Sequence, residues 1–377
     1  MQALLLVGAG LVAGALLLAR VPTVRPVDRG PAGAPAAGGR ATVSVVIPAR
    51  NEEGTLPVLL RSLARLDPPA HEVVVVDDAS TDATAGVAAA HGARVVRVDP
   101  PDGWLGKPWA CHVGSRVATG SHLVFLDADT WLAPDALTRL VAEHAASGGL
   151  VSVQPRHQTE RSYEQLSAMF NVTAMMGTGA FAPGRGGRAA MAFGPCLVAT
   201  TDEYRAVGGH AAVAGQVVED VHLARAYRAR GLPVRCLGGG DAVGVRMYPA
   251  GLRGLVEGWT KNIAAGAGLS PPWALGGSIA WVASCAAVAW MGVRGVAGWP
   301  FGGGAPLVPG AAWVVTALCL RWMLARIGTW RWWTAWLFPV PLAVFLVVFL
   351  RSLVATLVRG EVTWRDRRVP VGVRAGR

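Results

Sequence analysis

The sequence is short of charged residues and of cysteines. Asp, Glu, Lys and Arg together make up 16% of its 377 residues, whereas hydrophobic residues make up 52%. A soluble domain has about 25% charged residues, so we expect part of this chain to lie in an apolar environment. The five cysteines are odd in number and form no C-x-x-C pair. These features argue against a disulfide framework or a cysteine zinc site, and they favour a reducing compartment.

Acidic residues are fewer than basic ones, which gives a net charge of +11. Much of the basic excess follows apolar runs. Arginines after the first and the last run are Arg20, Arg25, Arg29, Arg359, Arg365, Arg367, Arg368, Arg374 and Arg377. This placement favours an anionic membrane surface as the partner. The basic residues do not interleave with aromatic residues in one patch, so we expect no nucleic-acid partner.

No charged side chain precedes the first apolar run, residues 3–18. A cleaved signal peptide begins with basic residues and ends at a small-residue cleavage site. The sequence therefore predicts an uncleaved transmembrane anchor over residues 1–20, with its C-terminal side in the cytoplasm. The run is short, so a span here requires tilt or a thinner bilayer. Residues 21–40 are rich in Pro, Gly and Ala and predict a linker.

Residues 41–250 predict a catalytic domain of the α/β class. Four apolar runs typical of strands occur at residues 43–47, 73–76, 95–98 and 123–126. Helical patterns separate them, such as the one formed by Leu56, Leu59, Leu60 and Leu63. This alternation predicts a parallel-rich sheet with helices on both faces. In such sheets ligands bind beyond the carboxyl ends of the strands.

The last third of the chain predicts membrane segments. Residues 251–272 form an amphipathic, interfacial segment. About three transmembrane segments are expected within residues 273–358, and residues 359–377 form a basic tail. One N-terminal span plus three more gives four crossings, which puts both termini on the same side of the membrane. If the catalytic domain is cytoplasmic, the basic tail would then lie outside the cell. Because positive charge prefers the cytoplasm, one apolar stretch is expected to be re-entrant or interfacial, and Arg351 marks the last as a candidate.

Acidic residues follow two of the predicted strands. Asp78 ends the second strand and is placed to accept hydrogen bonds from a base or ribose, although a turn with a helix cap explains it equally well. Asp127 and Asp129 follow the fourth strand, one residue apart. Two carboxylates at this spacing suit a hard divalent cation, which would neutralise a diphosphate leaving group. An acidic turn that caps the next helix is the alternative.

Three further motifs carry candidate site residues. Glu219 and Asp220 begin a predicted helix and are candidate catalytic carboxylates, unless they only supply favourable charge at the helix N-terminus. Lys107 lies in the segment GWLGKPWAC and is expected to meet a phosphate, unless it is solvated on a surface loop. Trp259 and Lys261, in GWTKNI, are weaker candidates for contact with the acceptor or a phosphate. An interfacial aromatic anchor explains this motif at least as well.

Five segments in order resemble the family 2 glycosyltransferases of the GT-A fold: VSVVIPARNEE, VVVDDAST, GWLGKPWAC, LVFLDADT and VVEDVHLARAYRARG. The resemblance covers residues 43–265, and the membrane segments fit the membrane-bound branch. It implies a Rossmann-like sheet that binds a nucleotide-diphosphate sugar and a metal ion, Mg²⁺ or Mn²⁺.

The resemblance also implies roles for individual residues. Glu52 and Asp78 match the nucleotide-contacting positions, Asp127 and Asp129 the phosphate and metal positions, and Asp220 the general base. Many processive members end the site with Q-x-x-R-W, which this chain lacks. GWTKN stands at about that place, which favours a single transfer over polymerisation.

Within the family, PPDGWLGKPWAC and the tail VTWRDR resemble the carotenoid and hopanoid-associated glycosyltransferases. This implies inverting transfer from a UDP-sugar, with glucose as the expected sugar, to a membrane lipid such as a carotenoid or related isoprenoid. A polyprenyl-phosphate sugar synthase and a hopanoid-associated transferase are alternatives, and a non-catalytic membrane scaffold is a third. We expect a multi-pass protein of the cell membrane with a cytoplasmic catalytic domain.

Overall fold

A computed structural model describes residues 2–27, 41–296, 307–359, 361–364 and 367–370. Residues 28–40 of the predicted linker and much of the predicted basic tail lie outside the described residues. The chain divides into two compact units. The sheet unit comprises residues 22–156 and 187–246. The helical unit comprises residues 1–21, 157–186 and 247–377.

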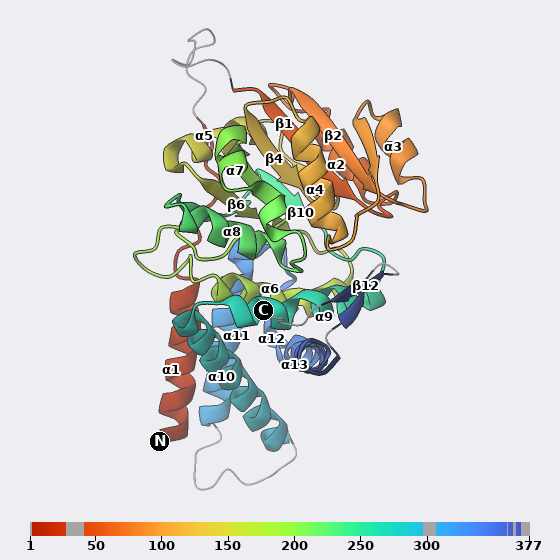
Figure 1. Cartoon of the computed structure of the whole chain (residues 1–377). Coiled ribbons are helices and arrows are strands. Elements are labelled where there is room, and N and C mark those ends of the chain that lie inside the picture. Colours follow the sequence, from red (N-terminus) through yellow and green to blue (C-terminus); the bar gives the residue numbers. More distant parts are fainter. Residues whose placement is uncertain (1, 28–40, 297–306, 360, 365–366, 371–377) are drawn as a thin grey trace. The chain divides into compact units, whose positions relative to one another are not determined.

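A seven-stranded sheet forms the core of the sheet unit, in the order β3-β2-β1-β4-β8-β6-β9 (Figure 1). The first four predicted strands are present and parallel. Strand β8 runs antiparallel to both of its neighbours, while β6 and β9 pair in parallel. The strands are β1 Val43–Ala49, β2 Glu72–Asp78, β3 Arg94–Val98, β4 His122–Leu126, β6 Leu150–Gln154, β8 Cys196–Thr200 and β9 Val234–Gly238.

Helices cover both faces of this sheet, because alternate residues of a strand point to opposite faces. Val45 and Ile47 of β1 pack in the cluster that contains the four leucines predicted for the first helix. Val46 packs on the other face with Ala110 and Cys111. The predicted α/β class with flanking helices is thus confirmed. The helices are α2 Leu56–Leu63, α3 Thr84–Ala90, α4 Gly106–Val117, α5 Ala136–Ser147, α7 Thr201–Ala206 and α8 Glu219–Ala229, with the 3₁₀ helix η2 Gly209–Val213.

Short strands complete the sheet unit near the end of β4. Strand β5, Thr130–Leu132, pairs antiparallel with β10, Val243–Val245. This pairing draws the segment after Asp129 toward the chain that follows β9. A further short strand, β7, covers Arg156–His157.

Within its described residues, the helical unit contains three stretches long and apolar enough to cross a membrane, namely Pro272–Gly295, Val308–Ile327 and Pro339–Val358. They agree with the predicted apolar segments of the last third. Its elements are α1 Gln2–Leu17, η1 Ser162–Ser167, α6 Ala168–Gly177, α9 Leu252–Leu269, α10 Pro272–Val296, α11 Leu307–Ile327, α12 Trp332–Trp336, α13 Pro339–Val354, η3 Ala355–Arg359, β11 Glu361–Trp364 and β12 Arg367–Pro370. Strands β11 and β12 pair antiparallel.

The N-terminal helix α1 is a shorter apolar helix, so its crossing of a membrane stays a prediction. It packs against α10 through two glycines four residues apart. A Cβ atom on Gly10 would overlap Ser284, and one on Gly14 would overlap the ring of Trp281. Small residues at this spacing let two apolar helices approach closely, as in many membrane helix pairs.

The predicted catalytic domain over residues 41–250 is continuous, whereas the sheet unit lacks residues 157–186. The intervening helix α6 belongs to the helical unit. Phe170 of α6 stacks on Trp259, with ring centroids 4.9 Å apart, and meets Phe345 edge-on at 5.1 Å. A helix that is apolar on every side has to be buried on every side, which explains this placement.

Candidate active site

The loops after β1 and β2 are held together at the carboxyl edge of the sheet. Asn51 has a positive φ of 52°, and its backbone N–H donates to Ser80 Oγ at 3.0 Å. The next N–H, that of Glu52, donates to Thr84 Oγ1 at 2.8 Å. The Glu52 carboxylate accepts a short hydrogen bond from the Thr55 hydroxyl. Glu52 therefore lies in the loop that adjoins the end of β2, as its predicted nucleotide role requires.

Asp77 and Asp78 have different roles, which the sequence alone left open. Asp77 Oδ1 accepts from Ser80 N at 3.1 Å and so stabilises the turn after β2. Asp78 is 5% exposed, and its carboxylate lies so close to Gly106 that a Cβ there would overlap it. Gly106 begins α4, and a carboxylate is stabilised by the partial positive charge at a helix N-terminus. Arg50 Nη1 also donates to the Asp78 backbone oxygen at 2.8 Å.

Lys107 joins two of the predicted acidic motifs. Its Nζ lies 2.8 Å from Asp127 Oδ1 and 3.1 Å from Glu219 Oε1. The Lys107 side chain is 32% exposed and that of Asp127 28%, whereas that of Glu219 is 8% exposed. Lys107 lies in the first turn of α4 rather than on a loop. Residues more than one hundred positions apart in the chain thus form one charged cluster with an open side.

Gly194 was not among the predicted site residues, yet it lies inside this cluster. A Cβ atom on Gly194 would be 3.0 Å from Lys107 Nζ and 3.2 Å from Asp220 Oδ2. The backbone before β8 therefore passes directly beside both side chains. The only sequence signal is the Gly194-Pro195 pair that precedes an apolar run.

The cluster combines a fixed cation with a carboxyl group that titrates near neutrality. Burial and the charge of Glu219 raise the pKa of Asp220 and Lys107 opposes the shift, which together bring this pKa to about 7. Burial lowers the pKa of Lys107, but Asp127 and Glu219 outweigh this and raise it well above its usual value. Lys107 therefore stays protonated, while Asp220 can exchange a proton at physiological pH. Such a carboxyl group suits general base catalysis.

Asp127 and Asp129 fit a cation that is shared with a substrate. Among the described residues, no group of three or more His, Cys, Asp or Glu side chains is arranged to hold a metal ion. A magnesium ion in a nucleotide site typically takes one or two carboxylates and completes its shell with phosphate oxygens and water. Asp127 and Asp129 are both partly exposed just after β4 and provide that minimal set. Lys107 neutralises part of the charge of Asp127, so a metal ion would bind there together with the negatively charged diphosphate rather than alone.

The two weaker candidates belong to the helical unit, on α9. Trp259 is buried against Phe170, and its Nε1 donates to Ser167 Oγ at 3.2 Å. The structure therefore favours a packing role for Trp259 over stacking on a sugar. Lys261 is half-buried two residues later. Its contact with an acceptor or phosphate stays a prediction.

Comparisons with known proteins agree with the resemblance found in the sequence. Residues 44–187 match the family model described as "Glycosyl transferase family 2". The chain is 40% identical over 246 residues to the 4,4'-diaponeurosporenoate glycosyltransferases of Staphylococcus aureus strains MRSA252 and NCTC 8325. Each alignment covers 64% of this chain and 65% of the relative, so the chain matches slightly less than two thirds of the relatives' length.

A solved structure shares the fold. It is "Mannosyltransferase PcManGT from Pyrobaculum calidifontis in complex with GDP-Man and Mn2+", with a TM-score of 0.56 and 21% identity. The similarity covers 92% of this chain and 97% of that one. The solved structure supports the predicted GT-A fold, and residues 44–187 are similar to family 2 glycosyltransferases.

Proposed function

We propose that this chain is an inverting glycosyltransferase that moves a sugar, with glucose as the expected one, from a UDP-sugar to a membrane lipid of the carotenoid or related isoprenoid class. The observation that carries the proposal is the cluster of Lys107, Asp127, Glu219 and Asp220 at the carboxyl edge of the sheet. Its support is the 40% identity to diaponeurosporenoate glycosyltransferases and the three apolar helices of the same chain.

The proposed reaction assigns one task to each part of the cluster. Glu52 and Asp78 contact the nucleotide, and Lys107 meets the diphosphate as a point charge. A divalent cation held by Asp127 and Asp129, Mg²⁺ or Mn²⁺, would neutralise the leaving diphosphate. Glu219 holds Lys107 in place, with 3.1 Å between their charged atoms.

Asp220 acts on the acceptor. It takes the proton of an acceptor hydroxyl, or orients the acceptor, as the acceptor oxygen forms its bond to the anomeric carbon. The bond from that carbon to the diphosphate breaks on the opposite side, and the nucleoside diphosphate leaves with inversion at the carbon. A pKa of about 7 leaves a large fraction of Asp220 ionised and ready to accept the proton.

We further infer that the chain resides in the cell membrane with the catalytic residues on the cytoplasmic side. The support is the position of Arg20 and Arg25 directly after the first apolar helix. Basic residues beside a span are retained in the cytoplasm.

Mass spectrometry of lipid extracts from a carotenoid-producing bacterial host tests the proposal. Parallel cultures express the intact chain, Asp220→Asn, and Asp202→Asn as a matched control on the exposed start of α7. We expect a hexose-bearing lipid with the intact chain and the control, and none with Asp220→Asn. If the Asp220→Asn culture forms the same hexosyl lipid, Asp220 is not the general base. If no culture forms a hexosyl lipid, the acceptor is not a carotenoid.

A further inference from the structure

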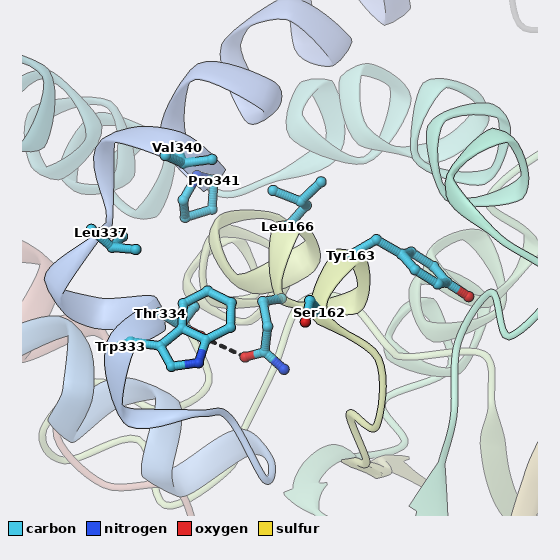
Figure 2. Close-up of a pocket in the computed structure, with 9 residues that line it drawn as sticks. Ser162, Tyr163, Leu166, Trp333, Thr334, Leu337, Val340 and Pro341 are labelled. Carbon is cyan, nitrogen blue, oxygen red and sulfur yellow. Dashed lines mark hydrogen bonds between the residues drawn. The ribbon is translucent and has the colours of Figure 1, made fainter.

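The helical unit contains a pocket between η1, α12 and the start of α13, which Figure 2 shows. None of the lining residues that the structure describes carries a charge. A diphosphate without a counter-ion would be costly to bury there. The proposed transfer therefore depends on the charged cluster of the sheet unit, and on the residues that hold the groups of this cluster at their distances.

Gly194 lies beneath the cation and the proposed base of the cluster. A Cβ atom on Gly194 would be 3.0 Å from Lys107 Nζ, 3.2 Å from Asp220 Oδ2 and 3.5 Å from Asp220 Cβ. Non-bonded atoms prefer a separation of about 3.5–4.0 Å, so the first two contacts would be too close by a few tenths of an ångström. Both charged atoms can lie at this depth because residue 194 has no side chain.

The backbone on both sides of Gly194 is held from outside the cluster. Ser152 Oγ accepts from Phe193 N at 2.6 Å and donates to Phe193 O at 3.1 Å. On the other side, Pro195 O accepts from Asp127 N at 3.0 Å, and the pairing of β8 with β4 begins at the next residue. The ring of Pro195 also restricts its φ. The segment is thus unable to recede, and an added side chain would displace the charged groups above it.

Ser152 is fully buried in β6, where an apolar side chain would be the usual choice. A buried hydroxyl costs free energy unless hydrogen bonds satisfy it. Two hydrogen bonds of Ser152 go to the backbone of Phe193. What the hydroxyl adds to the strand is therefore a clamp on the segment that precedes β8.

The spacing that this segment sets matters for the chemistry. In the proposed transfer Lys107 faces the leaving diphosphate and Asp220 faces the acceptor, so the anomeric carbon lies between them. Reacting atoms have to approach within about 3–3.5 Å, and a misplacement of about 1 Å costs about a hundredfold in rate. A change in this spacing should act on the rate of transfer, whereas the proposed contacts of the nucleotide with Glu52 and Asp78 are unaffected.

We propose that Gly194 is a positioning residue that sets the spacing between Lys107 and Asp220, and that Ser152 anchors the backbone on which this spacing depends. The proposal rests on the transfer proposed above. It assigns a part in that reaction to two residues that act through others.

Steady-state kinetics of the purified full-length chain test the role of Gly194. The substrates are UDP-glucose with Mn²⁺ and the lipid extract of a carotenoid-producing host, and the release of UDP is measured. Gly194→Ala should lower kcat at least about tenfold, because the methyl group displaces both charged atoms, while the Kd of UDP changes less than about threefold. Gly86→Ala is the matched control on α3, since a Cβ there meets no atom within 4 Å.

The outcomes of this experiment separate two failures. A smaller loss of kcat in Gly194→Ala, or a loss of UDP affinity as large as the loss of kcat, would overturn the role of Gly194. An intact chain that releases no UDP would contradict the transfer itself. Thermal unfolding of each variant shows that it is folded at the assay temperature.

Ser152→Ala tests the anchor. Loss of the hydroxyl breaks both bonds to Phe193, so the segment can recede from an added methyl group. Ser152→Ala alone should lower kcat about threefold, and it should cause no further loss when it is added to Gly194→Ala, because the two changes act through the same segment. A double variant whose loss of kcat is the product of the two single losses would overturn the role of Ser152.

Discussion

The two units stabilise their inner polar groups in different ways. At the edge of the sheet, Lys107, Asp127 and Glu219 bring full charges together, and Lys107 and Asp127 keep about a third of their side chains in contact with solvent. In the helical unit, Gln165 and Thr334 form a neutral pair that is almost fully buried. Charged groups cost little free energy where water or a charged ligand reaches them. Apolar surroundings favour neutral groups that form hydrogen bonds with the backbone and with each other.

Replacing Lys107, the cation of the charged cluster, should have the largest effect of the changes considered, because the cluster depends on full charges. Lys107→Met leaves the Glu219 and Asp220 carboxylates close together and deprives the diphosphate of a positive contact. We expect release of nucleoside diphosphate to slow by about a hundredfold or more, as for other electrostatic groups in active sites. Lys107→Arg keeps the charge and is the control. A Lys107→Met rate within threefold of the intact chain would show that the cluster is structural.

The pH dependence of the rate should show whether Asp220 is the base. The proposed base works ionised, so the rate should fall about tenfold for each pH unit below its pKa of about 7, which Asp220→Asn cannot reproduce. The stability has the opposite sign. A folded-state pKa above the unfolded value of about 3.9 means that the native state binds the proton more tightly. The stabilisation by Asp220 is therefore present at low pH and is lost as the pH rises toward about 7.

Thermal unfolding at several pH values measures this second effect. The melting temperature of Asp220→Asn relative to the intact chain should increase between about pH 4 and pH 7. A constant difference across this range would show that the pKa of Asp220 is close to its unfolded value.

In the helical unit, a change that introduces a steric clash should lower the stability more than the loss of a hydrogen bond. Gly14→Leu forces a side chain into the ring of Trp281 and should destabilise the pairing of α1 with α10 by about 1–3 kcal/mol, the usual effect of overpacking. Gly8→Leu on the same helix is the matched control, since a Cβ there meets no atom within 4 Å. Thermal unfolding in detergent compares the two variants. Equal stability would contradict the packing of α1 on α10.

The loss of a single neutral hydrogen bond should have the smallest effect on stability. Ser352 Oγ donates to the backbone oxygen of Thr260 at 2.6 Å and accepts from Ala264 N at 3.2 Å, which joins α13 to α9. Ser352→Ala should lower the free energy of unfolding by about 0.5–1 kcal/mol, less than the loss expected for Gly14→Leu. The same denaturation assay measures this loss. A loss as large as that of Gly14→Leu would mean that neutral contacts, rather than close packing, dominate this unit.

The sequence predicts the sheet unit well where the signal is local. Strands β1 to β4 are rich in apolar and β-branched residues, and the acidic residues that follow them are conspicuous in a chain with so few charges. The antiparallel strand β8 was not predicted, because its pairing of Cys196 with Leu126 depends on residues seventy positions apart. The position of Gly194 beside Lys107 depends on the same pairing.

The helical unit is less predictable for a physical reason. Length and hydropathy indicate its three long apolar stretches. They cannot indicate that α6, in the middle of the predicted catalytic domain, packs with those helices. Gln165 lies on a short 3₁₀ helix with no amphipathic period, so only the structure shows that its amide is buried. Trp259, a weak candidate for contact with the acceptor, is buried in the core of this unit, which its motif alone does not indicate.

Equilibrium binding of nucleotide to the purified chain tests the central claim most directly, namely that the charged edge of the sheet is a metal-dependent nucleotide-sugar site. UDP and GDP are titrated with and without Mn²⁺ against the intact chain, Asp129→Ala, and Asp202→Ala as the exposed control. We predict binding of UDP that requires the metal, weakens at least about tenfold in Asp129→Ala, and is unchanged in the control. Metal-independent binding of equal strength in all three proteins would contradict the account.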